Sequence, residues 1–182
     1  MITPLDKAAV FIDGSNLYAA ARGLDMQMDY KRMLEWLGKN FRVVRAHYYT
    51  AIAEGEDGYS PLTPMADWLS YNGFSVVTKP AKTFTNNGVT KVKGNMDIEM
   101  AVDALELAPH VDQIILFTGD GDFTRLVQAI QRKGVRVVVI STIKSQPPMM
   151  SDELRRQADE FIELDFLRPH IEKVEKAVKV AK

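Results

Sequence analysis

Short runs of apolar residues alternate along the chain with longer segments whose apolar positions recur every three or four residues. Runs of the first kind are typical of buried strands, and segments of the second kind are typical of helices that pack one face on a core. The predicted strands cover residues 8–12, 42–50, 74–78, 113–118 and 135–140. The predicted helices between them cover residues 15–22, 30–37, 61–72, 96–107 and 123–132. This alternation favours an α/β fold built around a parallel sheet.

Turn and cap residues predict the ends of several elements. Asp29 is expected to cap the second helix and Gly38 to end it. The sequence Asn86-Asn87-Gly88 predicts a tight turn between two short β segments. A further short helix is expected to begin near Ser151.

The end of the chain predicts an amphipathic helix over residues 166–178. Its apolar face would carry Leu167, Ile171, Val174 and Val178. The 182 residues suit one domain with a tail, and 46% of them are hydrophobic, which is enough for a sizeable core. We therefore expect one domain over residues 1–165, followed by the C-terminal helix and a basic tail over residues 166–182.

Aspartates follow two of the predicted strands at the point where each strand ends. Asp13 ends the first apolar run, and Asp120 and Asp122 follow the run 114–118. Ligands of open parallel sheets bind beyond the carboxyl ends of the strands, so these carboxylates are expected to face one crevice. Crowded carboxylates repel one another, and a hard divalent cation bound through oxygen would offset their charge.

Each aspartate also has a simpler interpretation as a helix cap. Asp13 and Asn16 lie where a helix begins, and Asp122 lies just before the helix that follows the fourth strand. Asp97 falls in a first helical turn, where the helix dipole favours a carboxylate. Capping explains one acid of the Asp120 and Asp122 pair but not both. Asp103 lies about 240° round the helix from Asp97, so we expect it on another face.

Composition excludes several classes of protein. The chain has no cysteine, which excludes disulfides, thiolate metal sites and cysteine nucleophiles. Its formal net charge is −1, so global charge does not indicate a partner. The first residues lack the pattern of a signal peptide, and no apolar run approaches the ~20 residues that span a bilayer. We expect a cytoplasmic protein without a membrane partner.

Basic residues gather in two segments that contain no acid. Residues 79–96 carry Lys79, Lys82, Lys91 and Lys93. Residues 123–150 carry five more cations, of which Arg125 is the first. Cations beside an acidic pocket suit a phosphodiester polymer, because they neutralise flanking phosphates while the carboxylates hold a metal. For any single lysine, ordinary solvated surface is the favoured explanation.

Three motifs carry a resemblance to a known family. They are Phe11-Ile12-Asp13-Gly14-Ser15-Asn16, Lys93-Gly94-Asn95-Met96-Asp97 and Thr118-Gly119-Asp120-Gly121-Asp122-Phe123. In their order and spacing, over roughly residues 7–142, the chain resembles the NYN domain family, the LabA/DUF88 branch of PIN-like nucleases. The commoner family form has a small or branched apolar residue at the position of Asn95-Met96.

The resemblance implies a three-layer α/β/α PIN-like domain with a central, mostly parallel sheet of five or six strands. It also implies metal-dependent cleavage of RNA, with Mg²⁺ or Mn²⁺ as cofactor, and it is compatible with a homodimer. The catalytic residues it implies are Asp13, Asp97, Asp120, Asp122 and Asn16, and the four aspartates among them would hold the metal. The expected RNA-binding residues are Ser15, Lys79, Lys82, Lys91, Lys93 and Arg125.

Other functions remain compatible with the same residues. The fold could serve as a non-catalytic RNA-binding or regulatory module, although intact acids argue for turnover. A phosphatase of the haloacid dehalogenase type also begins with a strand that ends in Asp, but it needs a second Asp two residues later. That position is Ser15 here, which disfavours the phosphatase. A purely structural role for all four aspartates is a further alternative, which is disfavoured because clusters of perturbed acids in clefts usually signal function.

Overall fold

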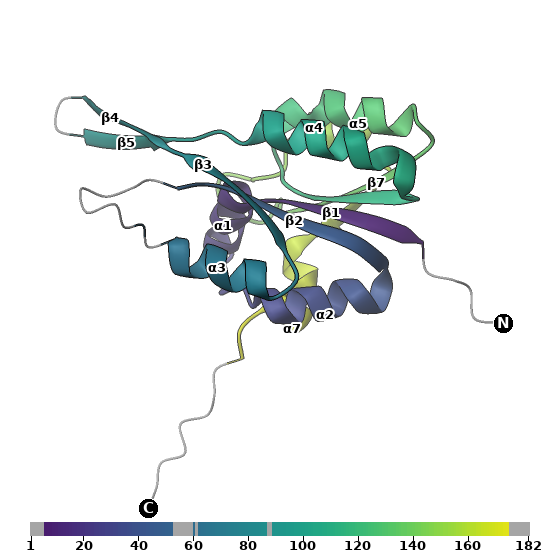
Figure 1. Cartoon of the computed structure of the whole chain (residues 1–182), viewed down its shortest axis with the longest axis horizontal. Helices are drawn as coiled ribbons and strands as arrows, with labels where there is room; N and C mark the ends of the chain where they lie inside the picture. Colours follow the sequence, from purple (N-terminus) through teal and green to yellow (C-terminus); the bar gives the residue numbers. More distant parts are fainter. Residues whose placement is uncertain (1–5, 53–59, 61, 87–88, 175–182) are drawn as a thin grey trace, which may run out of the picture.

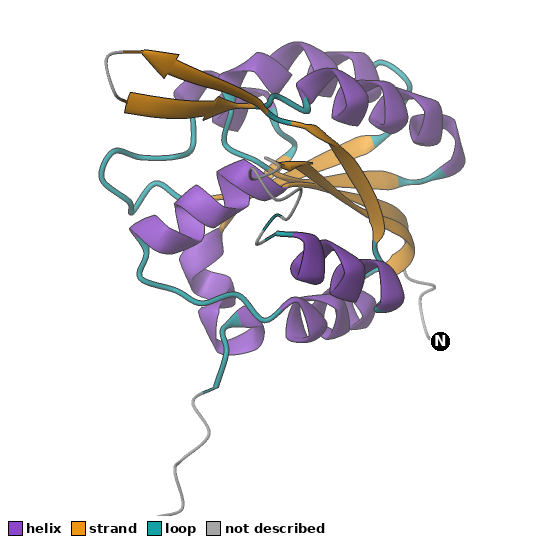
Figure 2. Cartoon of the chain, turned by 60° about the vertical axis from the view of Figure 1, so that its left-hand side comes forward, coloured by secondary structure: helices purple, strands orange, loops and turns teal. Residues whose placement is uncertain are grey.

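The computed structural model describes residues 6–52, 60, 62–86 and 89–174, and for residues 82–86 and 89–93 it describes the backbone alone. A six-stranded sheet forms the centre of the domain (Figure 1). Its strands are β1 (Lys7–Asp13), β2 (Arg42–Ile52), β3 (Ser75–Pro80), β6 (Gln113–Phe117), β7 (Arg136–Ser141) and β8 (Glu160–Glu163). β4 (Lys82–Asn86) and β5 (Val89–Lys93) pair as an antiparallel hairpin that projects from the body of the domain (Figure 2). Asn87 and Gly88 of the predicted turn lie outside the described residues.

The sheet has the order β3-β2-β1-β6-β7-β8, and every neighbouring pair is parallel. The chain therefore builds outwards from β1 through β2 and β3, and then continues on the other side of β1. The direction of building reverses between β1 and β6. The space beyond the carboxyl ends of these two strands, called the crevice below, is where open α/β sheets bind ligands. The predicted α/β fold is confirmed, with six strands and a wholly parallel sheet.

Helices cover both faces of the sheet (Figure 1). One face carries α1 (Gly14–Gly23), α2 (Tyr30–Asn40), α3 (Thr63–Tyr71) and α7 (Arg168–Ile171). The other face carries α4 (Asp97–Leu107), α5 (Thr124–Gln131) and α6 (Asp152–Gln157). Within the described ranges, no helix has the length and apolar character needed to cross a membrane.

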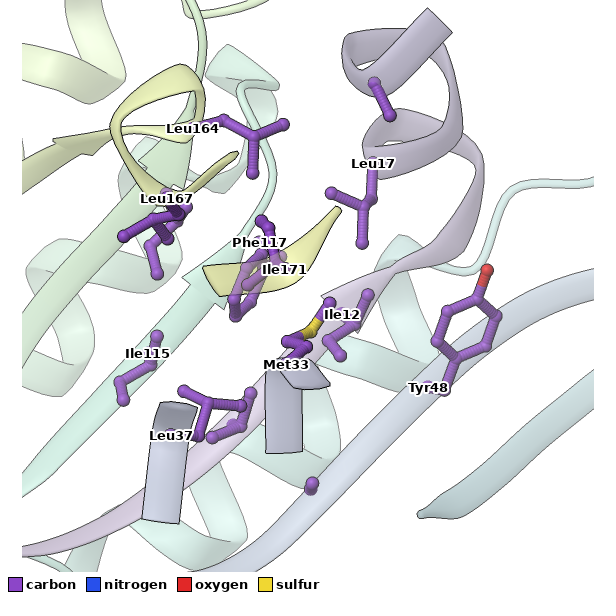
Figure 3. Close-up of a cluster of buried hydrophobic side chains, with 14 of the residues drawn as sticks. Ile12, Leu17, Met33, Leu37, Tyr48, Ile115, Phe117, Leu164, Leu167 and Ile171 are labelled. Carbon is purple, nitrogen blue, oxygen red and sulfur yellow. The ribbon is translucent and has the colours of Figure 1, made fainter. Parts of the chain in front are cut away.

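Strand β1 is buried on both of its faces. Val10 and Ile12 pack into the apolar cluster beneath α1 and α2, and Phe11 packs into the cluster beneath α4 and α5. Figure 3 shows the first cluster, in which side chains from several helices meet those of the sheet. Burial on both faces explains why this strand reads as a continuous apolar run. It also fixes where Asp13, at the end of the strand, emerges.

The C-terminal segment differs from the predicted long helix. A 3-10 turn over Leu164–Leu167 leads into α7, which ends at Ile171. Glu172 has an extended backbone and forms a β-bridge with Met28. This backbone pairing takes the place of a further helical turn. Leu167 and Ile171 are buried as expected, and Val174 is exposed. Val178 lies outside the described residues, and the division at residue 165 stays a prediction.

The expected end of α2 at Gly38 is wrong, because the helix continues to Asn40. A Cβ added to Gly38 would meet no atom within 4 Å. We therefore expect Gly38→Ala to raise the free energy of unfolding by about 0.5–1 kcal/mol, since glycine inside a helix has an entropic cost. Urea denaturation measures this change, and an equal loss of stability would contradict the helical assignment at this position.

Candidate metal centre

Asp13 emerges from the end of β1 and caps α1. Its Oδ1 accepts a hydrogen bond from the Asn16 backbone N–H at 3.1 Å and another from the Ser15 hydroxyl at 2.8 Å. The capping interpretation is therefore correct for Asp13. Both bonds end on Oδ1, and Oδ2 has no hydrogen-bond partner among the described residues, so the cap leaves one oxygen for a ligand.

Asp120 follows β6 and caps the 3-10 turn Gly121–Phe123. Its Oδ1 accepts from the backbone N–H of Asp122 at 2.9 Å, and its own N–H donates to Thr118 Oγ1 at 3.2 Å. The expectation that Asp122 caps the following helix is wrong, because α5 begins without a side-chain cap. The carboxylate of Asp122, which is exposed, is free of that capping bond.

Asp97 is the first residue of α4 and is oriented by Asn95. The Asn95 amide donates to Asp97 Oδ2 at 2.6 Å, and the Asp97 N–H donates to Asn95 Oδ1 at 2.6 Å. This reciprocal pair leaves Oδ1 of Asp97 without a hydrogen bond in the described part of the chain. The sequence motif included Asn95, but its orienting role follows only from the structure.

The fold brings three of these carboxylates together. One oxygen from each of Asp97, Asp120 and Asp122 lies within 4.8 Å of the other two. Asp13 is near enough for its charge to act on Asp97. Burial raises the pKa of Asp97 most strongly, and the charges of Asp120, Asp13 and Asp122 raise it further against the opposing hydrogen bond from Asn95. Three segments distant in sequence therefore place four acids at the crevice between β1 and β6.

The donor set of this cluster suits a hard divalent cation. Carboxylate oxygens are the protein ligands that Mg²⁺ and Mn²⁺ prefer. Among the ion pairs between described side chains, none involves Asp13, Asp97, Asp120 or Asp122. A bound cation would offset the repulsion from Asp120, Asp13 and Asp122 that adds to burial in raising the pKa of Asp97.

Gly119 fixes the loop that carries Asp120 and Asp122. Its N–H donates to Asn16 Oδ1 at 2.9 Å, and its carbonyl accepts from the Ser151 N–H at 2.8 Å. Asn16, a predicted site residue, thus ties the start of α1 to the end of β6 through its carbonyl oxygen. Neither Gly119 nor Ser151 was predicted to matter for the site, because their partners lie far away in the sequence.

Two polar contacts hold α4, and with it Asp97, against the sheet. The Tyr49 hydroxyl donates to Asp103 Oδ2 at 2.7 Å. Lys79 Nζ lies 2.9 Å from Glu99 Oε1. Asp103 therefore points to β2, in agreement with its predicted separation from Asp97. Lys79, expected to bind RNA, is paired with an acid in this structure.

The remaining expected RNA-binding residues are Ser15, Arg125 and three lysines of the hairpin. Arg125 is exposed on the first turn of α5 and donates to Gln128 Oε1 at 2.6 Å. Ser15 donates to Asp13 and so helps to orient that carboxylate. The side chains of Lys82, Lys91 and Lys93 lie outside the described part of the structure.

We expect Asp97→Asn to stabilise the metal-free protein at neutral pH. The pKa of Asp97 is raised on folding, so the folded state opposes ionisation, and this cost grows as pH rises from the unfolded pKa through the folded one. The gain from the variant should therefore vanish under acid conditions in which Asp97 is protonated in both states. Thermal unfolding in EDTA across this pH range measures the effect.

With added Mn²⁺, the wild type should become more stable than the Asp97→Asn variant. A cation that binds only the folded state raises the melting temperature of the wild type, and the Asp97→Asn variant should gain less. Equal shifts for the two proteins would contradict a role for Asp97 in holding the ion.

In the comparison with known proteins, a family matches the region of the chain that contains the four aspartates. The NYN domain family matches residues 7–165. The chain is 31% identical over 175 residues to the low amplitude and bright protein LabA of Synechococcus elongatus, and the match covers 93% of this chain and 90% of that protein. It is also 36% identical over 89 residues to an uncharacterised protein of Methanocaldococcus jannaschii, a match to 47% of this chain and 35% of the other.

A solved structure shares the fold. The crystal structure of a protein of unknown function from Vibrio parahaemolyticus superposes with a TM-score of 0.71 and 29% sequence identity. The superposition covers 91% of this chain and 96% of that one. The family match spans the six strands of the central sheet, helices α1 to α6 and all four aspartates of the crevice. The chain belongs to the NYN domain family, within the PIN-like nuclease superfamily.

Proposed function

We propose that this protein is a metal-dependent ribonuclease that hydrolyses phosphodiester bonds of RNA, preferably of single strands. The observation that carries the proposal is the gathering of Asp97, Asp120 and Asp122, with ligand oxygens within 4.8 Å of one another, beside Asp13. Membership of the NYN domain family supports it, because the domain belongs to a superfamily of nucleases.

The residues of the crevice have distinct roles in this proposal. Asp97, Asp120 and Asp122 would hold Mg²⁺ or Mn²⁺, with Asp13 as a fourth ligand or as an acceptor for metal-bound water. The bound cation would lower the pKa of a water nucleophile and stabilise the charge that develops on the phosphate. Asn95 and Ser15 orient two of the carboxylates, and Asn16 fixes the loop of Asp120.

RNA is the proposed substrate because the segments that precede Asp97 and follow Asp122 in the sequence carry cations and no acid. Arg125 is exposed one residue beyond the start of α5 and can neutralise a phosphate next to the one that is cleaved. The lysines of the hairpin β4–β5 precede Asp97 in the sequence and would add to this charge. No histidine is required, since metal-bound water can supply the nucleophile.

Incubation of a labelled, unstructured RNA with Mn²⁺, with Mg²⁺ and with EDTA tests the proposal. We expect strand cleavage with a divalent cation and none in EDTA. Matched single-stranded DNA and a small phosphomonoester distinguish a ribonuclease from a general nuclease and from a phosphatase. RNA that binds but survives with both cations would replace the proposal by a non-catalytic RNA-binding module.

A further inference from the structure

We propose that a hollow between α1, α2 and α3 binds a nucleobase of the RNA strand whose backbone is cleaved at the aspartates. This inference rests on the proposed function and adds a second subsite to it, on the opposite face of the sheet from α4 and α5. The hollow has a volume of about 440 Å³. That volume lies within the range of ~300–1,000 Å³ that is usual for small-ligand sites.

The walls of the hollow have the chemistry of a stacking site. The residues that line it include three methionines, Met26, Met28 and Met65, and two tyrosines, Tyr18 and Tyr30. Tyr18 is 63% exposed, so its ring is accessible to a ligand at the hollow. Bases stack on aromatic rings whatever their sequence, and methionine adapts its shape to flat ligands.

Cations stand at the rim of the same hollow. Arg22 and Lys173 both line it and both are exposed, against one acid, Asp25. Neither cation belongs to an ion pair among the described side chains. If a base lies in the hollow, the phosphates of its nucleotide lie near these two cations. An uncharged peptide segment would have no negative charge to pair with them.

The hollow is joined to the aspartate site through α1. This helix begins at Gly14, directly after Asp13, and Tyr18 and Arg22 follow at intervals of four residues on one side of it. At 1.5 Å per residue, Tyr18 lies about 6 Å along the helix axis from Gly14. A nucleotide bound at Tyr18 is therefore close in position to one whose phosphate lies at Asp13.

A pair of tyrosines forms a second, buried link. The hydroxyl of Tyr30, in the wall of the hollow, lies 3.1 Å from that of Tyr48, and the two rings meet edge to face with centroids 5.5 Å apart. Tyr48 in turn packs against Gly14, where an added Cβ would lie 2.7 Å from the tyrosine ring. The wall of the hollow is thus connected, through Tyr30 and Tyr48, to the backbone next to Asp13.

Binding of a fluorescent oligoribonucleotide to Tyr18→Ala tests the inference. Anisotropy is measured with Ca²⁺ in place of Mg²⁺, and a gel shows whether the strand stays intact. We expect about a tenfold rise in Kd, because one stacked base is lost. Tyr18→Phe should stay within about twofold of the wild type, since stacking does not need the hydroxyl. Tyr71→Ala is the matched control, because Tyr71 is 89% exposed and does not line the hollow.

Removal of single bases from the oligonucleotide shows which nucleotide enters the hollow. One abasic position should weaken binding to the wild type about as much as Tyr18→Ala does. The same abasic strand should then bind Tyr18→Ala with no further loss, because the two changes remove one interaction. Additive losses, or equal losses for Tyr18→Ala and Tyr71→Ala, would overturn the inference.

The outcomes separate the subsite from the proposed function. Wild-type protein that cleaves RNA, together with a Tyr18→Ala variant of unchanged Kd, would remove the subsite and leave the ribonuclease. Wild-type protein that neither binds nor cleaves RNA would remove both.

Discussion

Asp120→Asn is expected to lower the rate of metal-dependent RNA cleavage by at least about a thousandfold. A bound cation contributes several kcal/mol to stabilisation of the transition state, and each ~1.4 kcal/mol corresponds to a factor of ten in rate. Asparagine keeps the size of the side chain and its Oδ1, so the hydrogen bond from the Asp122 N–H is preserved. The fold should therefore survive while the metal loses a charged ligand. Initial rates under single-turnover conditions with Mn²⁺ measure the loss.

Asp67→Asn is the matched control for this variant. Asp67 is exposed on α3 and carries the same change in charge without belonging to the crevice. We expect its cleavage rate to stay within about twofold of the wild type. If Asp120→Asn cleaves as fast as Asp67→Asn, Asp120 is not a ligand of the catalytic metal. A rate loss shared by both variants would mean that general charge, and not the crevice, controls activity.

Gly119→Ala is expected to lower the free energy of unfolding by about 2–4 kcal/mol and to abolish cleavage. An added Cβ would lie 2.1 Å from the carbonyl oxygen of Met149 and 2.5 Å from Ser141 Oγ. The first of these atoms belongs to the backbone and cannot rotate away. The loop must therefore shift, and with it the hydrogen bonds that Gly119 makes to Asn16 and Ser151. Urea denaturation and the RNA assay measure the two effects.

Gly121→Ala provides the comparison within the same loop. Its added Cβ would meet only the side chain of Ser151, with Oγ at 3.1 Å, and a shift of a few tenths of an ångström would relieve this contact. We expect a loss below about 1 kcal/mol. Similar losses for the two glycines would contradict the close approach of Met149 to Gly119.

The parts of the fold that the sequence predicted are those with a local signal. β1 and β6 read as continuous apolar runs because both faces of these strands are buried. The aspartates at their ends could be assigned to one crevice because carboxyl ends of parallel strands meet at one edge. Asp97 could be assigned to the same site because it lies at the start of α4, a position that the motif around it indicated.

The parts that escaped prediction depend on contacts between distant residues. β8 has only four residues, of which only the middle two, Phe161 and Ile162, are apolar, and its pairing with β7 gives it the strand form. α7 ends early because Glu172 pairs with Met28, some 140 residues away. The choice of Asp120 over Asp122 as the cap follows from the 3-10 turn that precedes α5, which has no clear sequence signal.

The hollow beside α1 illustrates the same limit for function. Tyr18 and Met65 lie on helices that are distant in sequence, and their spacing within each helix resembles that of ordinary core positions. Only the arrangement of the three helices shows that Tyr18 is exposed while it borders a space that could hold a base.

Cleavage of a labelled, unstructured RNA by the wild type and by Asp13→Asn, in parallel with Mn²⁺ and with EDTA, tests the central claim most directly. Asparagine at position 13 can still cap α1, so the variant should fold. We predict cleavage by the wild type with Mn²⁺, none in EDTA, and none by the variant under either condition. Cleavage that persists in EDTA, or that proceeds at the same rate in Asp13→Asn, would contradict a metal-dependent nuclease centred on these aspartates.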